Sequence, residues 1–464
     1  MDRHSKYEKI MLGQAQGADD VSRAFAQASH AARAKQVVAS SHEQAIADVA
    51  AGVAGPALIG YVQWILRRAR DLGLERLRFL SRDGQVLHLL AERIIERTGQ
   101  KIDLEYVYSS RITWSLAATD PARLSQFDWL FSSFMKSNAQ DLCARLGLDP
   151  NEFQQALAES GVSCDPRARA DSAPQLAALR RFVDREDVAA AVAPRIAQAR
   201  ALLLDYTRQH SLADPATGLV DAGWTGRMVG SLIHVTDGAD LPRPHIFFWG
   251  HEPRPDGWTD SDRLSAYLYN TARREGLQWR VPDAPFIIET FCMGDHGIFA
   301  GYQREPDGTI APTLRSERNT GADAWGLTLY RATLLAVADE LDLHVTGDAR
   351  PLIHDVMTAF WVNPDRAEAE AWGQYPYDSD PTGTAARSLA HRFYLRDVIA
   401  GLPKGRVKRG DRAWLRGSLA LSPAPIRLAT SALLSRKDRL GAPPLARDVP
   451  QSGTSAATSV RPGS

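Results

Sequence analysis

The chain has 464 residues, which suits two or three domains or one large α/β domain with insertions. Its 55 lysines and arginines balance 55 aspartates and glutamates, so the overall charge gives no argument for nucleic acid or for an acidic partner. Three scattered cysteines exclude a disulfide framework and a cysteine-based zinc site. With no secretory signal before the first domain, we expect a cytoplasmic protein.

The first part of the chain predicts helices. Residues 1–44 are rich in alanine, serine and glutamine and are predicted to form an N-terminal arm. The run 45–66 is apolar enough to be considered as a membrane span. Because it also contains Asp48, Gln63 and Gly55-Pro56, a buried helix pair that breaks at Gly55-Pro56 is the better interpretation.

Two short strands follow, and each ends in serine and arginine. Leu77–Leu80 ends in Ser81-Arg82-Asp83-Gly84, and an amphipathic helix comes next. Leu104–Tyr108 ends in Ser109-Ser110-Arg111. One arginine at a strand end is usually a solvated loop residue, but two of them suit a phosphate-rich ligand.

Residues 120–215 show helical patterns separated by Asp-Pro and Gly-Val breaks, and no good strand. We expect an inserted helical subdomain. It either covers the strand ends and recognises a substrate or serves a purely structural purpose.

A third strand ends in the most distinctive turn of the chain. Leu219–Asp221 leads into a turn bracketed by glycines, and a helix is predicted after the turn. The turn residues are Gly223, Trp224, Thr225, Gly226 and Arg227. Such a turn favours anion binding, because its N–H groups and the helix dipole point at the ligand. Asp221 lies at the carboxyl end of its strand, where open α/β sheets bind ligands. Ordinary turn chemistry would explain the same pattern.

Beyond this turn the sequence predicts another core strand, Ile246–Trp249, and a hairpin that turns at Asp307-Gly308. Glu289 and His296 are outside candidates for acid–base groups, although a lone histidine in a glycine-rich loop is usually structural. The region 321–400 is predicted to be helical.

The last segment is basic. Residues 401–440 carry ten lysines and arginines against two aspartates, with Trp414 and several leucines at helical spacing. This basic amphipathic segment suits an anionic membrane surface, unless Trp414 and the leucines pack on the protein. Residues 441–464 are rich in proline, serine, glycine and alanine and are predicted to be a disordered tail.

In chain order, the three strand-end loops resemble those of type I phosphoribosyltransferases. In that family the first loop holds the pyrophosphate of phosphoribosyl pyrophosphate (PRPP), and the second strand leads into a mobile hood. The third strand runs into an acidic-acidic-x-x-x-Thr-Gly loop that holds ribose and its 5-phosphate. Asp221 and Thr225-Gly226 match that loop. Val220 replaces its first acidic residue, and Trp224 is bulky for such a loop.

Four stretches, 55–66, 77–94, 106–111 and 219–226, also resemble proteins of bacterial surface-polysaccharide loci. These proteins are often labelled haloacid-dehalogenase-type hydrolases, because many carry such a phosphatase domain, whereas this chain has no DxDxT start. The resemblance spans about residues 45–310. It implies transfer of phosphoribose from PRPP to a sugar hydroxyl, with a separate phosphatase removing the 5-phosphate to leave ribofuranose in the glycan.

The resemblance also implies roles for particular residues. In the first two loops, the residues assigned to pyrophosphate are Ser81, Arg82, Gly84, Ser110 and Arg111. In the third loop, the residues assigned to the 5-phosphate are Gly223, Trp224, Thr225, Gly226 and Arg227. Asp221 and Asp83 are the candidates for the base that accepts the hydroxyl proton. Both aspartates are also expected to contact the cofactor Mg²⁺, which enters the site bound to PRPP.

We therefore expect an α/β fold with a mostly parallel sheet of phosphoribosyltransferase type, a helical insertion and a basic C-terminal segment. The core would comprise residues 45–119 and 216–320. The expected partners are PRPP and a lipid-linked glycan acceptor at the inner membrane, and not nucleic acid. Two alternatives stay open: a phosphosugar hydrolase, which should carry a second aspartate two residues after its nucleophile, and a non-catalytic scaffold docked to the membrane.

Overall fold

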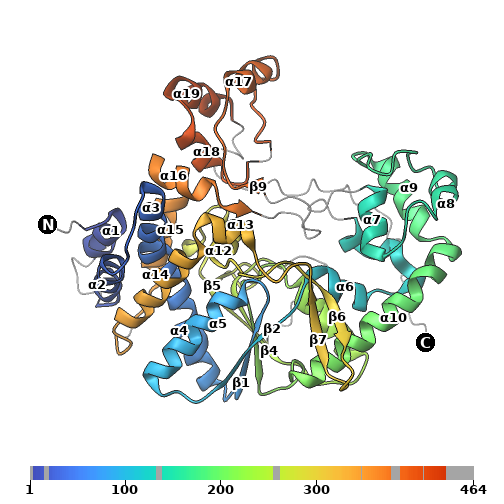
Figure 1. The fold of residues 1–464 in the computed structure, drawn as a ribbon, viewed down its shortest axis with the longest axis horizontal. Coiled ribbons are helices and arrows are strands. Elements are labelled where there is room, and N and C mark those ends of the chain that lie inside the picture. The colour runs from blue at the N-terminus through green and yellow to red at the C-terminus, as the bar shows by residue number, and fades with distance from the viewer. Residues whose placement is uncertain are drawn as a thin grey trace, which may run out of the picture.

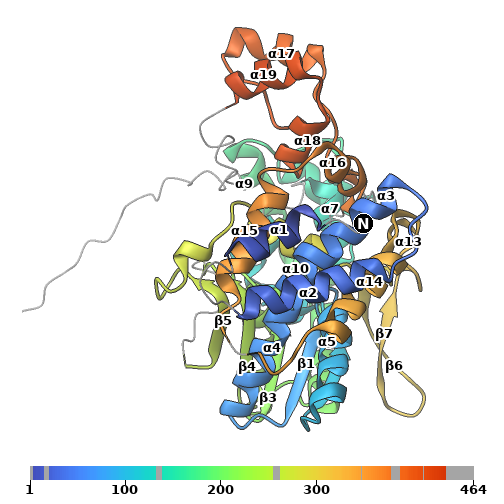
Figure 2. The ribbon, with the colours of Figure 1, turned by 90° about the vertical axis from the view of Figure 1, so that its left-hand side faces the viewer.

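The computed structural model describes residues 4–14, 20–131, 138–253, 262–345, 347–377, 387–410 and 412–434. Its centre is a five-stranded sheet with the order β2-β1-β3-β4-β5, and every neighbouring pair is parallel. Helices lie on both faces of the sheet (Figures 1 and 2). The predicted α/β class and the parallel sheet are confirmed.

The strands include the four that the sequence predicts, each within two residues of the expected ends. They are β1 (Arg76–Leu80), β2 (Asp103–Val107), β3 (Thr217–Asp221), β4 (His245–His251) and, unpredicted, β5 (Leu264–Asn270). Because β2 lies on one side of β1 and β3 on the other, the order changes direction between β1 and β3. In open α/β sheets the ligand crevice forms at such a point, outside the carboxyl ends of the strands.

Successive strand residues face two different cores, as expected for strands buried on both sides. On one face, Phe79 packs with α4 (Gly55–Asp71), α5 (Gly84–Thr98) and α14 (Leu327–Glu340). On the other face, Leu80 packs with α6 (Arg111–Ala118), α10 (Glu186–Gln209) and α11 (Arg227–Asp237).

The apolar run near the N-terminus forms one long helix. It comprises α3 (Ser41–Val49), a π-helical stretch (Ala50–Ala54) and α4, so the predicted break at Gly55-Pro56 is wrong. Pro56 lies in the first turn of α4, where the missing N–H costs little, and the wider π turns absorb the change in hydrogen bonding. The helix is long and apolar enough to cross a membrane, but 94% of its most apolar window is buried inside the protein.

Residues 1–44, predicted to be an arm, contain two packed helices and the start of α3. They are α1 (Lys6–Gln14) and α2 (Asp20–Ala34). Tyr7, Phe25 and Ala28 are buried in the same core as α4 and α14. Alanines at four-residue spacing give α2 a narrow buried face, which lets it lie close to its neighbours.

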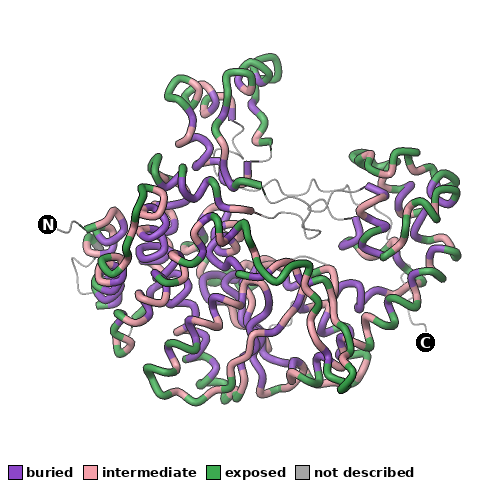
Figure 3. The backbone as a smooth tube through the Cα atoms, in the orientation of Figure 1, coloured by how far each residue is buried: buried purple, intermediate pink, exposed green. Residues whose placement is uncertain are grey.

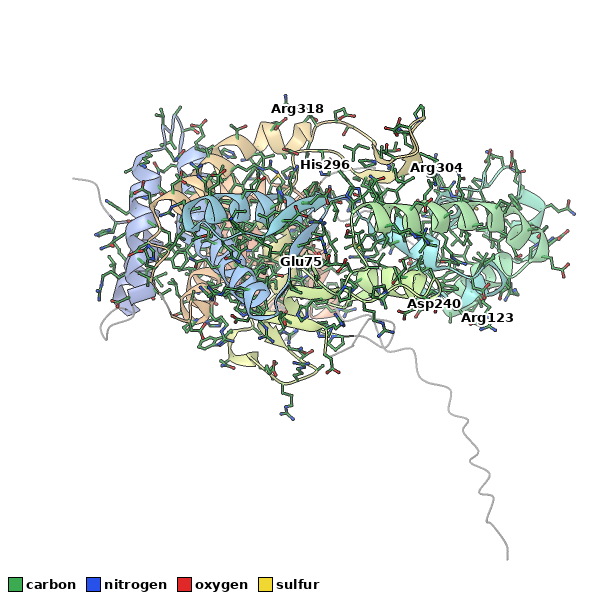
Figure 4. The ribbon with its side chains drawn as sticks, turned by 90° about the horizontal axis from the view of Figure 1, so that it is seen from below. Glu75, Arg123, Asp240, His296, Arg304 and Arg318 are labelled. Carbon is green, nitrogen blue, oxygen red and sulfur yellow. The ribbon has the colours of Figure 1, made fainter. Side chains whose placement is uncertain are left out.

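The described part of residues 120–215 consists of helices joined by turns and irregular loops, with no strand, and part of this segment has its own apolar cluster. α7 (Ala139–Leu146), α8 (Gln154–Glu159) and α9 (Ala173–Val183) pack with the first half of α10 around this cluster. Figure 1 shows them as a lobe at the right, joined to the sheet through α6 and α10. The predicted hairpin is also present as β6 (Phe299–Arg304) and β7 (Ile310–Leu314), and Arg304 pairs with Asp205 of α10 (Figure 4).

The last third of the described chain is mainly helical. Its elements are α12 (Ala284–Phe291), α13 (Thr320–Trp325), α14, α15 (Arg350–Trp361), α16 (Arg366–Gly373), β8 (Pro376–Tyr377), β9 (Arg387–Ser388), α17 (Leu395–Gly401), α18 (Leu415–Leu421) and α19 (Ala424–Leu433). Short 3₁₀ turns occupy Pro121–Gln126, Asp128–Leu130, Leu277–Trp279 and Leu402–Lys404. α17, α18 and α19 form the C-terminal lobe, which projects at the top of Figure 1.

Trp414 is buried in the protein, so of the two alternatives left open by the sequence the packing one is correct for this residue. Its Nε1 donates to the Trp361 carbonyl at 2.8 Å, and the two rings stack with centroids 5.1 Å apart. Leu415 and Leu419 are buried as well. Helical spacing of apolar residues predicted a buried face correctly but not what covers it. Residues 435–440 and the predicted disordered tail 441–464 lie outside the described residues.

The first prediction concerns this aromatic core. Trp414→Ala should lower the free energy of unfolding by about 3–5 kcal/mol, because it leaves a cavity and orphans the Trp361 carbonyl. Urea unfolding followed by near-ultraviolet circular dichroism measures the change. Leu428→Ala, at a position 71% exposed, is the control and should alter stability by less than about 0.5 kcal/mol. Equal effects of the two substitutions would contradict the packing described.

Candidate active site

The ends of β1 and β2 are tied together by two serines. Ser81 Oγ donates to the Ser109 carbonyl at 2.8 Å and accepts from the Ser109 N–H at 2.9 Å. Ser109 Oγ donates back to the Ser81 carbonyl at 3.2 Å. The peptide between Ser81 and Arg82 is cis. The Ser81 hydroxyl, predicted to bind pyrophosphate, therefore holds the two strand ends in register and leaves Arg82 and Asp83 to the site.

Two other predicted residues shape the first loops. Gly84 begins α5, and a Cβ there would lie 2.6 Å from the Phe79 carbonyl carbon, so only glycine allows the helix to start this close to β1. Ser110 caps α6 by accepting from the Thr113 N–H at 3.1 Å. Arg111, the first residue of α6, is exposed and free to point toward a ligand.

The loop after β3 has the form that its glycines predict. Gly223 and Gly226 have φ of 60° and 72°, and a Cβ at Gly223 would collide with the Phe248 ring. Gly226 is the N-cap of α11, and Thr225 Oγ1 accepts from the Arg227 N–H at 3.4 Å. The loop thus delivers small residues to the beginning of a helix of 11 residues, as an anion site requires.

Three carboxyl groups meet beside these loops. Asp83 follows β1, Asp221 ends β3, and Glu289 comes from α12. Each is half-buried and lies close enough to the others to shift their proton affinities. Glu289, only an outside candidate in the sequence, is therefore a full member of this carboxyl cluster.

Burial is the main influence on all three carboxyls. It raises the pKa of Asp83 well above its usual range, and the charges of Glu289 and Asp221 raise it further, against Arg82 and Arg111. It raises the pKa of Asp221 to about 6, against hydrogen bonds from the backbone of Gly223 and Ala222. It also raises the pKa of Glu289. Burial and mutual repulsion therefore favour the protonated forms of these carboxyls, and an approaching cation would oppose this effect.

Arg82 and Arg111 supply the opposing charge. Both lower the pKa of Asp83 and Glu289, so they lie on the same side of the site as the carboxyl cluster. Arg227, predicted to share in phosphate binding, instead begins α11 on the far side of the glycine loop. The site therefore has a strongly charged half at α5, α6 and α12, and a backbone-rich half at α11.

The indole N–H of Trp224 is buried beside Glu289. A hydrogen bond from this indole helps to lower the pKa of the Glu289 carboxyl. The ring stacks on Tyr269, with centroids 6.2 Å apart. The bulky residue that departs from the family motif thus places a buried donor next to a carboxyl of the site.

His296 is held by other protein groups. Its Nε2 pairs with the Tyr106 hydroxyl at 2.7 Å, and its Nδ1 with the Gly297 carbonyl at 2.7 Å. Burial lowers the pKa of the imidazole, which keeps it neutral. Figure 4 shows it above the sheet, away from the lobe of residues 120–215. With both nitrogens occupied, His296 is better suited to holding Tyr106 than to acid–base work.

The structure adds residues that no local motif indicated. The Tyr61 hydroxyl of α4 donates to the Asp221 carbonyl at 2.8 Å, which fixes the end of β3. Tyr375 and Tyr377 lie near the carboxyl cluster, and the charge of Glu289 is among the causes that raise the pKa of each phenol. These tyrosines are far from the carboxyls in sequence, so only the folded chain reveals them.

A loop between α12 and β6 is fastened to the start of α5. Gln85 Nε2 donates to Asp295 Oδ1 at 2.7 Å, and Gln85 Oε1 accepts from the Asp295 N–H at 2.9 Å. Arg331 of α14 donates to Asp295 Oδ2 at 2.8 Å and to the Met293 carbonyl at 3.1 Å. These contacts fix the position of Arg82, whose side chain packs on Gly294.

The expected Mg²⁺ finds suitable ligands but no closed site. Carboxylate oxygens are the ligands that this ion prefers. Among the described residues, however, only His4, Glu8 and His30 bring three ligand atoms within 4.8 Å of one another. There Arg33 Nε already donates to Glu8 at 3.0 Å, which disfavours a cation. The carboxyl cluster fits an ion that a diphosphate also holds, with one or two carboxylates completing its shell.

A cavity of about 420 Å³ lies elsewhere, beside β4 and β5, and shares no residue with the carboxyl cluster. Trp64, Arg68, His245 and Asn270 are among its lining residues. It does not coincide with the chemistry at the carboxyl ends of β1 and β3. No protein-family model and no curated protein matches this chain.

The second prediction follows from the raised pKa of Asp221. Because its folded value of about 6 exceeds the unfolded value of about 3.9, the folded state holds this proton more tightly. The resulting stability is present below about pH 4 and is lost as the pH rises through 6. Asp221→Asn should therefore raise the melting temperature more at about pH 7.5 than at about pH 4.5, as scanning calorimetry can measure.

The control for this experiment is Asp187→Asn. A hydrogen bond from Arg185 lowers the pKa of Asp187 on the surface, so its removal should slightly reduce stability at neutral pH. A melting temperature that Asp221→Asn leaves unchanged at both pH values would show that Asp221 is not a buried carboxyl of raised pKa.

Proposed function

We propose that the protein transfers 5-phosphoribose from PRPP to a sugar hydroxyl during assembly of a ribofuranose-containing surface glycan. One observation carries the proposal: the carboxyl cluster and two arginines converge where the strand order changes direction. The loops that resemble the pyrophosphate and ribose loops of type I phosphoribosyltransferases are those after β1 and β3, which flank this point. The phosphoribosyltransferase type of the fold is part of the same proposal.

The two ends of PRPP suit the two halves of the site. Arg82 and Arg111 match the pyrophosphate, because guanidinium groups bind phosphate oxygens through paired hydrogen bonds. The 5-phosphate matches the N–H groups around Thr225 and Gly226 at the beginning of α11, with Arg227 beside them. The ribose then spans the region between them, next to Asp221 and the Trp224 indole N–H.

The reaction exchanges one bond at C1 of the ribose. The bond from C1 to the pyrophosphate oxygen breaks, and its electron pair leaves with the pyrophosphate. The acceptor hydroxyl oxygen bonds to C1, and its proton passes to a carboxylate. Asp221 suits this role, because a pKa of about 6 leaves it mostly ionised at neutral pH yet basic enough to accept a proton. Negative charge beside C1 also stabilises the cationic character of the ribose.

Asp83 and Glu289 have different tasks in this proposal. Asp83 lies in the pyrophosphate loop, and its strongly raised pKa is expected to fall when a cation binds beside it. When bound, Mg²⁺ would neutralise charge on the departing pyrophosphate. Glu289 faces the Trp224 side, where it can hold ribose hydroxyls in place of the acidic residue that Val220 replaces.

The decisive experiment mixes the protein with PRPP, Mg²⁺ and candidate lipid-linked glycan acceptors, and weighs the product by mass spectrometry. A gain of one phosphoribosyl group, with release of pyrophosphate, supports the proposal. Release of phosphate from phosphosugars would indicate a hydrolase instead. Calorimetry without acceptor separates both from a scaffold, which would not bind PRPP.

The third prediction concerns the base. Asp221→Asn keeps the size of the side chain and removes its charge, so transfer should slow by about two to four orders of magnitude. PRPP binding should change far less, and calorimetry on the same preparation checks this. Asp83→Asn is the companion variant, because an unaffected rate in Asp221→Asn would leave Asp83 as the base. Asp187→Asn, on the surface lobe, should be as fast as the unmodified protein.

The fourth prediction concerns the pyrophosphate. Arg82→Ala should weaken PRPP binding roughly tenfold to a hundredfold, because a charge-assisted contact is lost. Arg82→Lys keeps the charge but not the planar fork, so its loss should be smaller. Arg208→Ala removes an exposed arginine that pairs with Asp205 and serves as the control. Equal affinity of all three variants would exclude Arg82 from the binding site.

A further inference from the structure

Exposed apolar side chains gather in one part of the molecule. Among the described residues, eight large apolar side chains are exposed, and five belong to the segment 394–428. They are Tyr394 (38%), Leu395 (61%), Ile399 (55%), Leu402 (59%) and Leu428 (71%). Figure 3 shows this lobe as largely exposed at the top of the molecule. Such clustering marks a surface that contacts something else, whereas singly exposed apolar residues need no explanation.

The arrangement along α17 is regular. Leu395, Ile399 and Leu402 recur at helical spacing, so they share one face of α17 and the turn that follows. Val398, at the flank of this face, is buried. The lobe has a separate small core of its own, which includes Phe393, Val407 and Leu415 and contains none of the exposed stripe. The stripe therefore lies outside the buried core of the lobe.

Positive charge surrounds the stripe. Six exposed cations lie in the lobe, and none forms an ion pair with another described residue: Arg392, Arg396, Lys404, Arg406, Lys408 and Arg427. Arg409 instead pairs with Asp283, at the beginning of α12, at 3.9 Å. Arg412 is buried and pairs with Asp397 at 3.0 Å, which uses the acidic group nearest to the stripe. The outer surface of the lobe thus carries unbalanced positive charge.

We propose that the C-terminal lobe docks on a bilayer containing anionic lipids, with Leu395, Ile399, Leu402 and Leu428 entering the headgroup region. An anionic bilayer offers partners to both parts of this surface, an apolar boundary for the stripe and negative charge for the cations around it. A second copy of the lobe would set like charges against each other. A nucleic acid would satisfy the cations and leave the apolar stripe in water.

The placement of the lobe gives the docking a direction. α12, which carries Glu289 of the carboxyl cluster, lies between the sheet and the lobe (Figure 1). The lobe thus projects from the side of the molecule where β1 and β3 end. Docking would therefore present this side of the protein, rather than the opposite edge of the sheet, to the bilayer. The inference goes beyond the proposed transfer reaction and does not depend on it.

The test uses the full chain and vesicles of phosphatidylglycerol mixed with phosphatidylcholine, or of phosphatidylcholine alone. Vesicle flotation should recover the protein with the anionic vesicles at low salt, and less of it at high salt. The combined change Leu395→Ser, Ile399→Ser and Leu402→Ser should weaken recovery at least tenfold. A charge variant, Lys404→Gln with Arg406→Gln and Arg427→Gln, should also weaken it and reduce its dependence on salt.

Val37→Ser with Leu277→Ser removes two exposed apolar residues elsewhere and is the matched control. It should float as the unmodified protein does. Failure of the intact protein to bind anionic vesicles overturns the proposal, as does full binding by both lobe variants. A change from dimer to monomer in the serine variant, without vesicle binding by the intact protein, would assign the stripe to self-association instead. PRPP binding measured on the same variants keeps this result separate from the transfer reaction.

Discussion

A parallel sheet buried on both faces is the constraint from which the rest of this structure follows. Parallel strands need crossover connections, and helices in those connections cover both faces of the sheet. All strand carboxyl ends then emerge at one edge, whatever the sequence distance between them. Asp83, Asp221 and their loops meet there because β1 and β3 are hydrogen-bonded neighbours. The connections that follow β1 and β3 run in opposite directions along the sheet, so a crevice that can take a ligand forms between them.

Electrostatics then sets the character of this edge. Three carboxyls in one half-buried place repel one another, and burial penalises the charge of each. The charges of Arg82 and Arg111 offset part of that penalty. Added positive charge would stabilise a site of this kind, and either the metal ion of a metal–diphosphate or a developing ribose cation would supply it. The fold tolerates the cost because its two large apolar cores lie directly beneath.

Short sequence patterns predicted the strands and turns well, because neighbouring residues largely determine these features. Four strands were predicted from short apolar runs that end in glycine, serine or aspartate. β5 was missed because Ser265 and Asn270 interrupt its apolar character, as an edge strand permits. Glu289 could be named but not placed, since its position depends on how α12 packs. The same limit applies to Trp414: periodicity identifies an apolar face but not whether protein or lipid covers it.

The long connection between β2 and β3 has a consequence for how the chain acquires its structure. Arg76 of β1 pairs with Thr217 of β3, so the centre of the sheet cannot close until the whole helical lobe between them has been synthesised. Non-local pairings of this kind slow folding, because loop-closure entropy must be overcome before the contacts form. The apolar cluster of residues 120–215 can consolidate early from local contacts. During synthesis, β1 therefore waits as an unpaired edge, and chaperones that shield such edges are expected to engage the nascent chain at this stage.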